Sequence, residues 1–180
     1  EASTVFASGA IRFDEVMYLR SLELVASPLA VSELEAWLER DLPAEGFISG
    51  QTTFGGTLQD LETVGRLTLV PTGMGGVSTT VDFSGTVHRG ENPGATDLEL
   101  RFNPLNYRML EPVWGSADRL ADGIGIVEID GRANDGMLIV ADLTHVSDSA
   151  NVSRAIGRGL LRRAEDGAWV TDMRGAVAPL

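Results

Sequence analysis

The chain contains an internal repeat. The segment "LELVASPLAVSELE" at residues 22–35 returns as "LELRFNPLNYRMLE" at residues 98–111, with seven of fourteen positions identical. The repeat offset, 98 − 22, is 76. Ordinary residue frequencies would give roughly one identity in such a window. A repeat of this kind predicts that one structural unit is built twice and that the copies stack their apolar surfaces.

The first copy of the unit reads as a strand followed by a short helix. The strand ends near Pro28, and "VSELEAWLERDL" then changes to a helical period. We expect a helix near residues 30–40, capped by Ser27 or Ser32. The residues at helical spacing, which we expect to be buried against a sheet, are Val31, Leu34, Trp37 and Leu38.

Strands separated by glycine-rich turns follow this helix. The clearest alternation lies in "GVSTTVDFSGTVHRG", where Val77, Thr79, Val81 and Phe83 share one parity. The intervening positions carry polar residues, Ser78, Thr80, Asp82 and Ser84. This pattern predicts a strand in a sheet that has one dry face.

The second copy begins at Leu98 and is also interrupted by a proline. It predicts a helix near 106–117 that buries Tyr107, Leu110 and Trp114, then strands in "DGIGIVEIDG" and "GMLIVADLTHV". In the tail, Val152, Ala155, Ile156 and Leu160 have helical spacing, which predicts a C-terminal helix near 150–164, followed by a strand in "GAWVTDMRGAV".

These elements define the expected fold class. We predict a mostly β fold with short helices, in which a curved, open antiparallel sheet forms a taco-like groove. Two related strand–helix–strand–strand modules, residues 1–96 and 97–180, build it as one continuous domain. The opening "EASTVFASGAIRF" has neither an initiator Met nor a signal peptide, so we expect a segment cut from a longer protein.

Charge and composition exclude several classes of function. The net charge of −12 and the pI near 4.5 argue against a nucleic-acid partner, because phosphate binding needs a basic surface. The absence of Cys excludes disulfides, thiolate metal sites and a cysteine nucleophile. The apolar runs are too short for a transmembrane helix.

The polar motifs carry no recognisable catalytic or metal-binding pattern. His88 and His145 lack metal-ligand spacing and are interpreted as residues at sheet ends. The segment "DGRANDG" (130–136) fits a hairpin turn better than a calcium loop, which would need a terminal Glu. Four arginines of the tail, Arg154, Arg158, Arg162 and Arg163, fit a solvated helix face better than a site for an anionic partner. We therefore predict no enzyme, no catalytic residue, no metal and no cofactor.

The remaining candidate is apolar surface. Ten apolar residues on predicted strands are expected to share one face of the sheet: Leu67, Leu69, Val77, Val81, Phe83, Leu98, Leu100, Phe102, Ile124 and Ile126. Only about two helices are clearly predicted, which is too few to cover such a face completely. The face can therefore hold a hydrophobic ligand. The alternative, a structural or interaction module with a filled core and no ligand, stays open on the sequence alone.

The segment "LPAEGFISGQTTFGGTLQDLETVGRLTLV" (42–70) resembles a recurrent phrase of the TamB/AsmA-like bacterial envelope proteins. That phrase is a short helix or loop, a Gly-initiated strand with a second Gly, a tight turn, and a strand of the type GxLxL. The matching residues are Gly46, Gly50, Gly55 or Gly56, Leu58, Gly65, Leu67 and Leu69, and the likeness extends over about residues 10–146.

This resemblance implies a function. Members of the family are thought to use a hydrophobic β groove to move phospholipid between the inner and outer membranes, or to aid outer-membrane assembly. The resemblance thus implies phospholipid acyl chains as the ligand and the periplasm as the location. It also implies a membrane anchor outside this segment and an outer-membrane β-barrel as a partner of the parent protein. It brings no catalytic residues.

Overall fold

The computed structural model describes residues 3–39, 41–42, 45–72, 77–105, 123–146, 152–164 and 167–179. These residues form ten strands and one helix. In chain order the elements are β1 (Val5–Phe13), β2 (Met17–Ala30), α1 (Val31–Leu38), β3 (Gly46–Thr57), β4 (Asp60–Pro71), β5 (Thr79–His88), β6 (Gly94–Leu105), β7 (Gly123–Arg132), β8 (Gly136–Val146), β9 (Val152–Arg163) and β10 (Trp169–Pro179).

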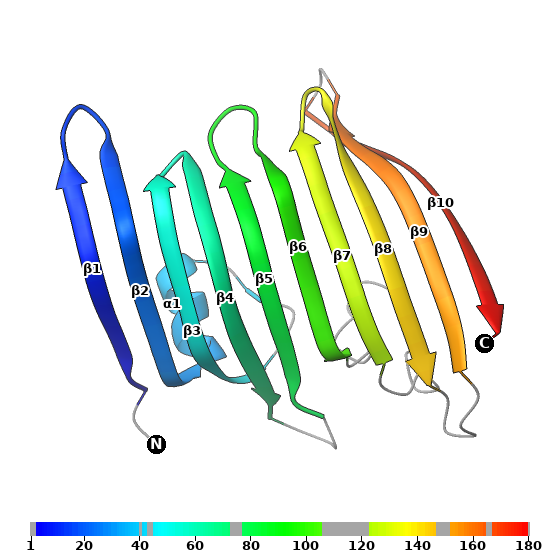
Figure 1. Cartoon of the computed structure of the whole chain (residues 1–180), viewed down its shortest axis with the longest axis horizontal. Coiled ribbons are helices and arrows are strands. Elements are labelled where there is room, and N and C mark those ends of the chain that lie inside the picture. The colour runs from blue at the N-terminus through cyan, green and yellow to red at the C-terminus, as the bar shows by residue number, and fades with distance from the viewer. Residues whose placement is uncertain are drawn as a thin grey trace.

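The ten strands make a single antiparallel sheet in which spatial order follows sequence order (Figure 1). The strands β1 and β10 are its two edges, and the sheet is open rather than closed into a barrel. The predicted fold class, a mostly β chain with an open antiparallel sheet, is confirmed. Neighbouring strands that are also sequence neighbours need only short connections, which suits the many glycine-rich turns of the chain.

The strand register separates the side chains into two faces, because directly opposed residues of paired strands lie on the same face and successive residues alternate. We name the face that contains Leu67 and Phe83 the apolar face. Its central positions, strand by strand, are Leu22 and Leu24 on β2, Thr52 and Phe54 on β3, Gly65 and Leu67 on β4, Val81 and Phe83 on β5, Leu98, Leu100 and Phe102 on β6, Val127 and Ile129 on β7, and Ile139 and Ala141 on β8. The opposite, polar face carries the charged strand residues except Arg163 at the end of β9, which lies opposite Trp169 on the apolar face.

Exposure follows the same division. On strands β2–β9, every large hydrophobic residue that is exposed lies on the polar face, as Val64 and Ile124 do. On the apolar face, the large hydrophobic residues that are exposed lie only on the edge strands β1 and β10. The apolar side chains of the inner strands therefore shield one another across strand boundaries, as cross-strand pairs do.

The repeat is structural as well as sequential. Gly9 of β1 and Gly85 of β5 have φ angles of 144° and 143°, and each lies opposite a β-bulge whose residue has positive φ, Ser21 (50°) and Asp97 (48°). The differences 85 − 9 and 97 − 21 both equal the repeat offset. The strands that begin the two sequence repeats are thus equivalent.

Two further register shifts recur with the same spacing. The pairing of β2 with β3 is interrupted between Leu19 and Leu22, and the pairing of β6 with β7 between Ala95 and Leu98. Each of these pairings is interrupted a second time. The second interruption ends at Leu29 in the β2–β3 pairing and at Leu105 in the β6–β7 pairing, and these two residues are again separated by the repeat offset. Bulges bend a strand and increase its twist, so both modules carry the same bends.

The helix α1 follows β2 directly and contacts β2 and β3. Val31 is 3% exposed, as expected, Leu34 is only half-buried, and the side chain of Leu38 is not among the described ones. The helix begins after Ala30 without a side-chain cap, so the prediction that Ser27 or Ser32 caps it was wrong. The extended Ala30 backbone continues from the strand, which leaves no room for a separate capping residue.

The prediction that Trp37 is buried was also wrong, because its side chain is 62% exposed. Six residues separate Trp37 from Val31, which places the two about 120° apart around the helix axis. A helix of eight residues that packs mainly against two strands buries a narrow stripe, and Trp37 lies at the margin of that stripe.

We expect Trp37→Ala to lower the free energy of unfolding by no more than about 0.5 kcal/mol, as at other exposed positions. Val31→Ala is the matched control on the same helix and should cost about 2 kcal/mol, because two buried methyl groups are removed. Urea denaturation of both variants measures the difference. A larger loss for Trp37→Ala than for Val31→Ala would contradict the observed orientation of the helix.

The predicted C-terminal helix near 150–164 is instead the strand β9, which pairs with β8 and β10 along its length. Gly157 and Gly159 weaken a helix in this segment, and Gly159 suits a strand that a neighbour approaches closely. A Cβ atom at Gly159 would lie 2.6 Å from Cγ of Met173 on β10. The predicted helix near 106–117, with Tyr107, Leu110 and Trp114, lies outside the described residues.

Candidate functional site

The apolar face is continuous across most of the sheet. Among the described residues, none of the apolar-face positions on β1–β8 is an Asp, Glu or Arg, and His145 at the end of β8 is the one titratable residue there. No second layer of described elements covers this face beyond α1, whose main contacts are with β2 and β3. A single-layer sheet with such a face has no packed interior and needs something to contact.

Glycines on this face are covered by neighbouring side chains. A Cβ atom at Gly65 would lie 2.6 Å from Cζ of Phe83, so the Phe83 ring occupies the space above that glycine. Gly125 is covered in the same way by Leu105 and Leu143, since a Cβ there would lie 3.0 Å from a methyl group of each. Large side chains therefore lie along the sheet and make a broad apolar surface, a device that also stabilises glycine-containing strands.

Seven of the ten candidate groove residues lie together on the apolar face: Leu67, Leu69, Val81, Phe83, Leu98, Leu100 and Phe102. Leu67 is directly opposite Val81, and Val81 is directly opposite Phe102. All seven are half-buried, which fits side chains that contact each other laterally and remain accessible from one side.

The other three candidates do not join them. Ile124 and Ile126 lie on the polar face, where Ile126 is opposite Arg101 and Asp142. Val77 precedes β5 and is 43% exposed. The expectation that Ile124 and Ile126 share the face was therefore wrong, and the strand register does not assign Val77 to either face.

The register shows which residues take their place on β7. Val127 and Ile129 lie opposite Leu100 and Leu98 on the apolar face. Their parity could have been read from the sequence, because Glu128 and Asp130 alternate with them and share the face of Ile124 and Ile126. The segment has apolar residues at both parities, and the isoleucines at its start made the even positions look apolar as well.

The face is also wider than the sequence candidates indicated. It includes Leu22, Leu24 and Phe54 in the first module and Ile139 and Leu143 on β8. The signal for the two leucines was the repeat itself, since Leu22 and Leu24 correspond to Leu98 and Leu100 at the repeat offset.

Threonines interrupt the apolar face at three buried positions. Thr52 donates a hydrogen bond from Oγ1 to the carbonyl oxygen of Val64 at 3.3 Å. The hydroxyl oxygens of Thr63 and Thr79 are buried and have no partner among the described residues. A buried hydroxyl without a partner costs about 1–3 kcal/mol, so these two positions oppose stability unless another group meets them.

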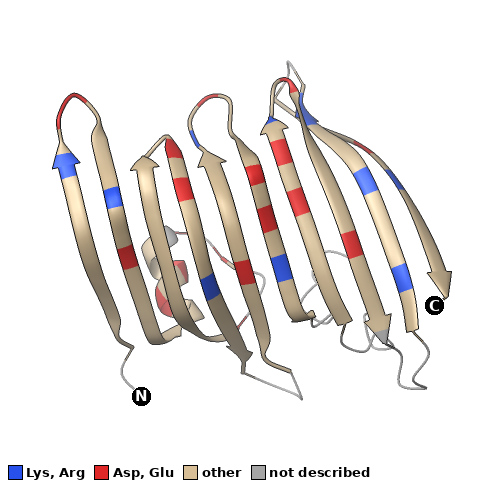
Figure 2. Ribbon diagram, viewed as in Figure 1, with Lys and Arg blue, Asp and Glu red and all other residues tan. Residues whose placement is uncertain are grey.

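Ion pairs occur on the polar face, and Figure 2 shows where basic and acidic residues lie along the strands. The Arg66 guanidinium on β4 donates two hydrogen bonds to the Asp82 carboxylate on β5, at 2.5 and 3.1 Å. Arg154 on β9 pairs in the same way with Asp142 on β8, and Arg101 with Glu99 within β6. These pairs are exposed, so each contributes modestly, but together they match charges along and between the strands.

A cluster around His88 joins the ends of four strands. His88 is 8% exposed; its Nδ1 lies 2.6 Å from Oδ1 of Asp60, and its Nε2 lies 2.8 Å from Oγ1 of Thr96. Arg132 also reaches Asp60, at 3.4 Å. Because both ring nitrogens are engaged and the ring is buried, the contacts describe a structural histidine at a sheet end, as the sequence indicated.

The paired aspartates make the fold sensitive to acid. The hydrogen bond with His88 lowers the pKa of Asp60, and those with Arg66 and Arg154 lower the pKa values of Asp82 and Asp142, in each case below the usual range of an aspartate. The folded chain therefore binds fewer protons than the unfolded chain, and the stabilisation is present above the unfolded pKa and is lost as the pH falls through the folded pKa.

We expect the urea midpoint of unfolding to fall as the pH is lowered from about 5 to about 2. Asp82→Asn and Asp142→Asn should each flatten this dependence, because they remove a carboxylate whose pKa is lowered by an arginine. A pH dependence that is unchanged in the double variant would contradict the role of these pairs.

The segment 130–136 contains the turn between β7 and β8, which is a hairpin, as predicted. The Asn92 side chain receives a hydrogen bond from the Asn134 amide at 2.9 Å and donates one to Asp135 at 3.5 Å. These groups are thus engaged in fixing the loop between β5 and β6 to the turn. No group of three or more potential metal ligands occurs within the described ranges.

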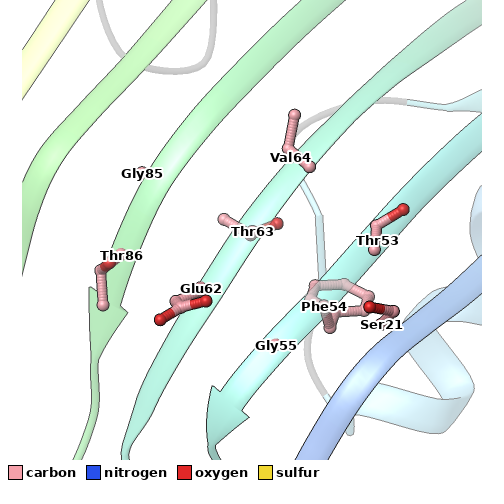
Figure 3. Close-up of a pocket in the computed structure, with 9 residues that line it drawn as sticks. All are labelled: Ser21, Thr53, Phe54, Gly55, Glu62, Thr63, Val64, Gly85 and Thr86. Atoms are coloured by element: carbon pink, nitrogen blue, oxygen red, sulfur yellow. The ribbon is translucent and has the colours of Figure 1, made fainter. Parts of the chain in front are cut away.

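An open depression lies over β3, β4 and β5 (Figure 3). Its lining residues are Ser21, Thr53, Phe54, Gly55, Glu62, Thr63, Val64, Gly85 and Thr86. Those lining residues that lie on the polar face, such as Thr53 and Thr86, are mostly short and uncharged. Glu62 is the one charged residue in this lining, and the other polar groups are serine and threonine hydroxyls, so the depression offers no cluster of charges to a ligand.

Comparison of the chain with protein-family models, with curated proteins and with solved structures finds no match. Within the described part of the chain, no helix has the length and apolar character needed to cross a membrane.

Proposed function

We propose that the apolar face binds phospholipid acyl chains and that the chain is a segment of an envelope protein that moves phospholipid between inner and outer membranes or aids outer-membrane assembly. The observation that carries the proposal is the continuous apolar face on β1–β8, free of Asp, Glu and Arg and left without a second layer by the described elements beyond α1. The resemblance to TamB/AsmA-like proteins adds the envelope context.

The physical support is the match between this surface and an acyl chain. Each methylene group removed from water contributes about 0.8 kcal/mol, so even a partly covered chain gains several kcal/mol. An unpaired charge beside the chain would oppose this, and the arginine–carboxylate pairs described above are on the other face. Side chains such as Phe83 and Leu100 lie side by side across strands and offer a continuous path rather than a closed pocket.

The location and partner follow from the resemblance. The segment would work in the periplasm, with the membrane anchor of the parent protein outside it. An outer-membrane β-barrel is the proposed partner of the parent protein, and the acidic charge of −12 disfavours a nucleic acid.

A photocrosslinking experiment tests the proposal. A benzophenone amino acid at Leu100, on the apolar face, should crosslink phospholipid when the protein is expressed in a diderm bacterium. The same group at Glu99, the preceding residue on the opposite face, is the matched control and should not. Native mass spectrometry of detergent-free protein should show co-purified phospholipid. If lipid is absent from both measurements, the structural module without a ligand becomes the better interpretation.

A further inference from the structure

The edge strand β10 has the properties of a strand that pairs with another. Its eleven residues are all exposed, and it pairs with β9 without any register shift. Within the described residues no strand lies on its other side. The opposite edge differs, because the pairing of β1 with β2 shifts at Gly9, which lies opposite the bulge at Ser21 of β2. Regular edge strands offer a row of free backbone groups for pairing, and bulges are one of the devices that block it.

The apolar face extends to this edge, where its large side chains are exposed, as they also are on the other edge strand, β1. Trp169, Met173 and Val177 lie on the apolar face of β10 and are 52%, 56% and 74% exposed. On β2–β9 no large hydrophobic residue of this face is exposed. The three side chains thus lack the lateral neighbour that each inner strand provides.

The charges at this edge are also incomplete. Arg174 of β10 lies directly opposite Arg158 of β9 on the polar face, a like-charge pair that opposes strand pairing. The structure shows no ion pair for either residue among the described parts of the chain, whereas Arg66 and Arg154 each pair with an aspartate on the neighbouring strand. A carboxylate from a strand beyond β10 would restore the pattern.

We propose that β10 pairs antiparallel with β10 of a second copy of the chain, about a two-fold axis at Met173. In this register Arg174 lies opposite Asp172 of the other copy, and Asp172 lies opposite Arg174. Trp169 lies opposite Val177, an aromatic residue against a β-branched one, and Met173 meets its symmetry mate. Both charge pairs and all three apolar contacts arise from a single register.

The second copy's β1 is a poorer occupant. Its polar face presents Arg12 and no carboxylate, so it leaves Arg174 without a partner. Pairing through β10 is isologous and closes as a dimer, as most homo-oligomers do. It places both apolar faces on the same side, and it stands independently of the lipid proposal.

Charge reversal tests the register. The wild-type chain should sediment as a dimer. Asp172→Arg and Arg174→Asp should each weaken dimerisation by at least about tenfold, because two opposite-charge pairs become like-charge pairs. An equimolar mixture of the two variants should form a heterodimer, since both pairs are then restored. Glu33→Arg on α1 carries the same charge change as Asp172→Arg and should remain dimeric. Wild-type affinity in either β10 variant, or a monomeric wild type at high concentration, would overturn the proposal.

A cysteine test reads the register directly, because the chain has no Cys. Directly opposed residues have Cα atoms about 4.5–5.5 Å apart, which a disulfide can span. Met173→Cys should therefore give an oxidised, covalent dimer. Val177→Cys is the control: its symmetry mate would lie eight residues away along the strand pair, at about 27 Å, and no crosslink should form. Efficient crosslinking at 177 but not at 173 would refute the register.

Discussion

Gly85→Val is expected to destabilise the sheet by about 3 kcal/mol or more. Gly85 has a φ of 143°, a region that residues with a Cβ rarely adopt, and a Cβ atom there would lie 2.5 Å from the Cα of Leu98 and 2.6 Å from the Asp97 carbonyl oxygen. Both contacts are with backbone, which cannot rotate away. The substitution must therefore displace the bulge between β5 and β6 near the centre of the sheet.

Urea denaturation followed by circular dichroism measures this effect. Gly157→Val is the matched control, because Gly157 lies within a strand, has no positive φ, and would place its Cβ no closer than 3.9 Å to another atom. That variant should be neutral or slightly stabilising, as valine favours strands. Equal stability of the two variants would show that the close approach at Gly85 does not exist.

Phe83→Arg is expected to abolish lipid binding while leaving the protein folded. Phe83 is half-buried on the apolar face, which no described element other than α1 covers, so the guanidinium can reach water rather than be trapped in a core. Loss of the ring over Gly65 lowers stability by about 1–3 kcal/mol. A charge in the path of the acyl chain should reduce lipid crosslinking at Leu100 at least about tenfold, equivalent to about 1.4 kcal/mol.

Ser84→Arg controls for the added charge, because Ser84 lies on the polar face opposite Glu99. It should preserve both stability and lipid crosslinking. A thermal melt measured beside the crosslinking assay separates the outcomes. Misfolding of Phe83→Arg, with no lipid crosslink in the wild type, would refute the groove and favour a filled core.

The sheet and its repeat were predictable because both depend on local patterns. Alternation from Thr79 to Ser84 placed Val81 and Phe83 on one face, and the repeat offset located equivalent strands. The parity of β7 was not predictable from its apolar residues alone, since isoleucine and valine occupy both parities. The pairing with β6 determines which parity of β7 lies on the apolar face, because Leu98 and Leu100 lie opposite Ile129 and Val127.

The prediction for the segment that forms β9 failed for a related reason. Its apolar spacing fits a helix, and only the neighbours β8 and β10 supply the hydrogen bonds that favour a strand with two glycines. For Trp37 the secondary structure was predicted correctly, because the residue lies in a helix. Its burial was not, because the small contact between that helix and the sheet determines which side chains are buried.

The recurrence of the bulges at the repeat offset has a consequence for how such a surface grows. Each module carries the same bends at the same places in its strands, so every added copy turns the sheet by a similar increment. A ribbon built in this way has a pitch set within one module and a length set by the number of modules. Tandem duplication of the unit would then lengthen the apolar track without changing its cross-section.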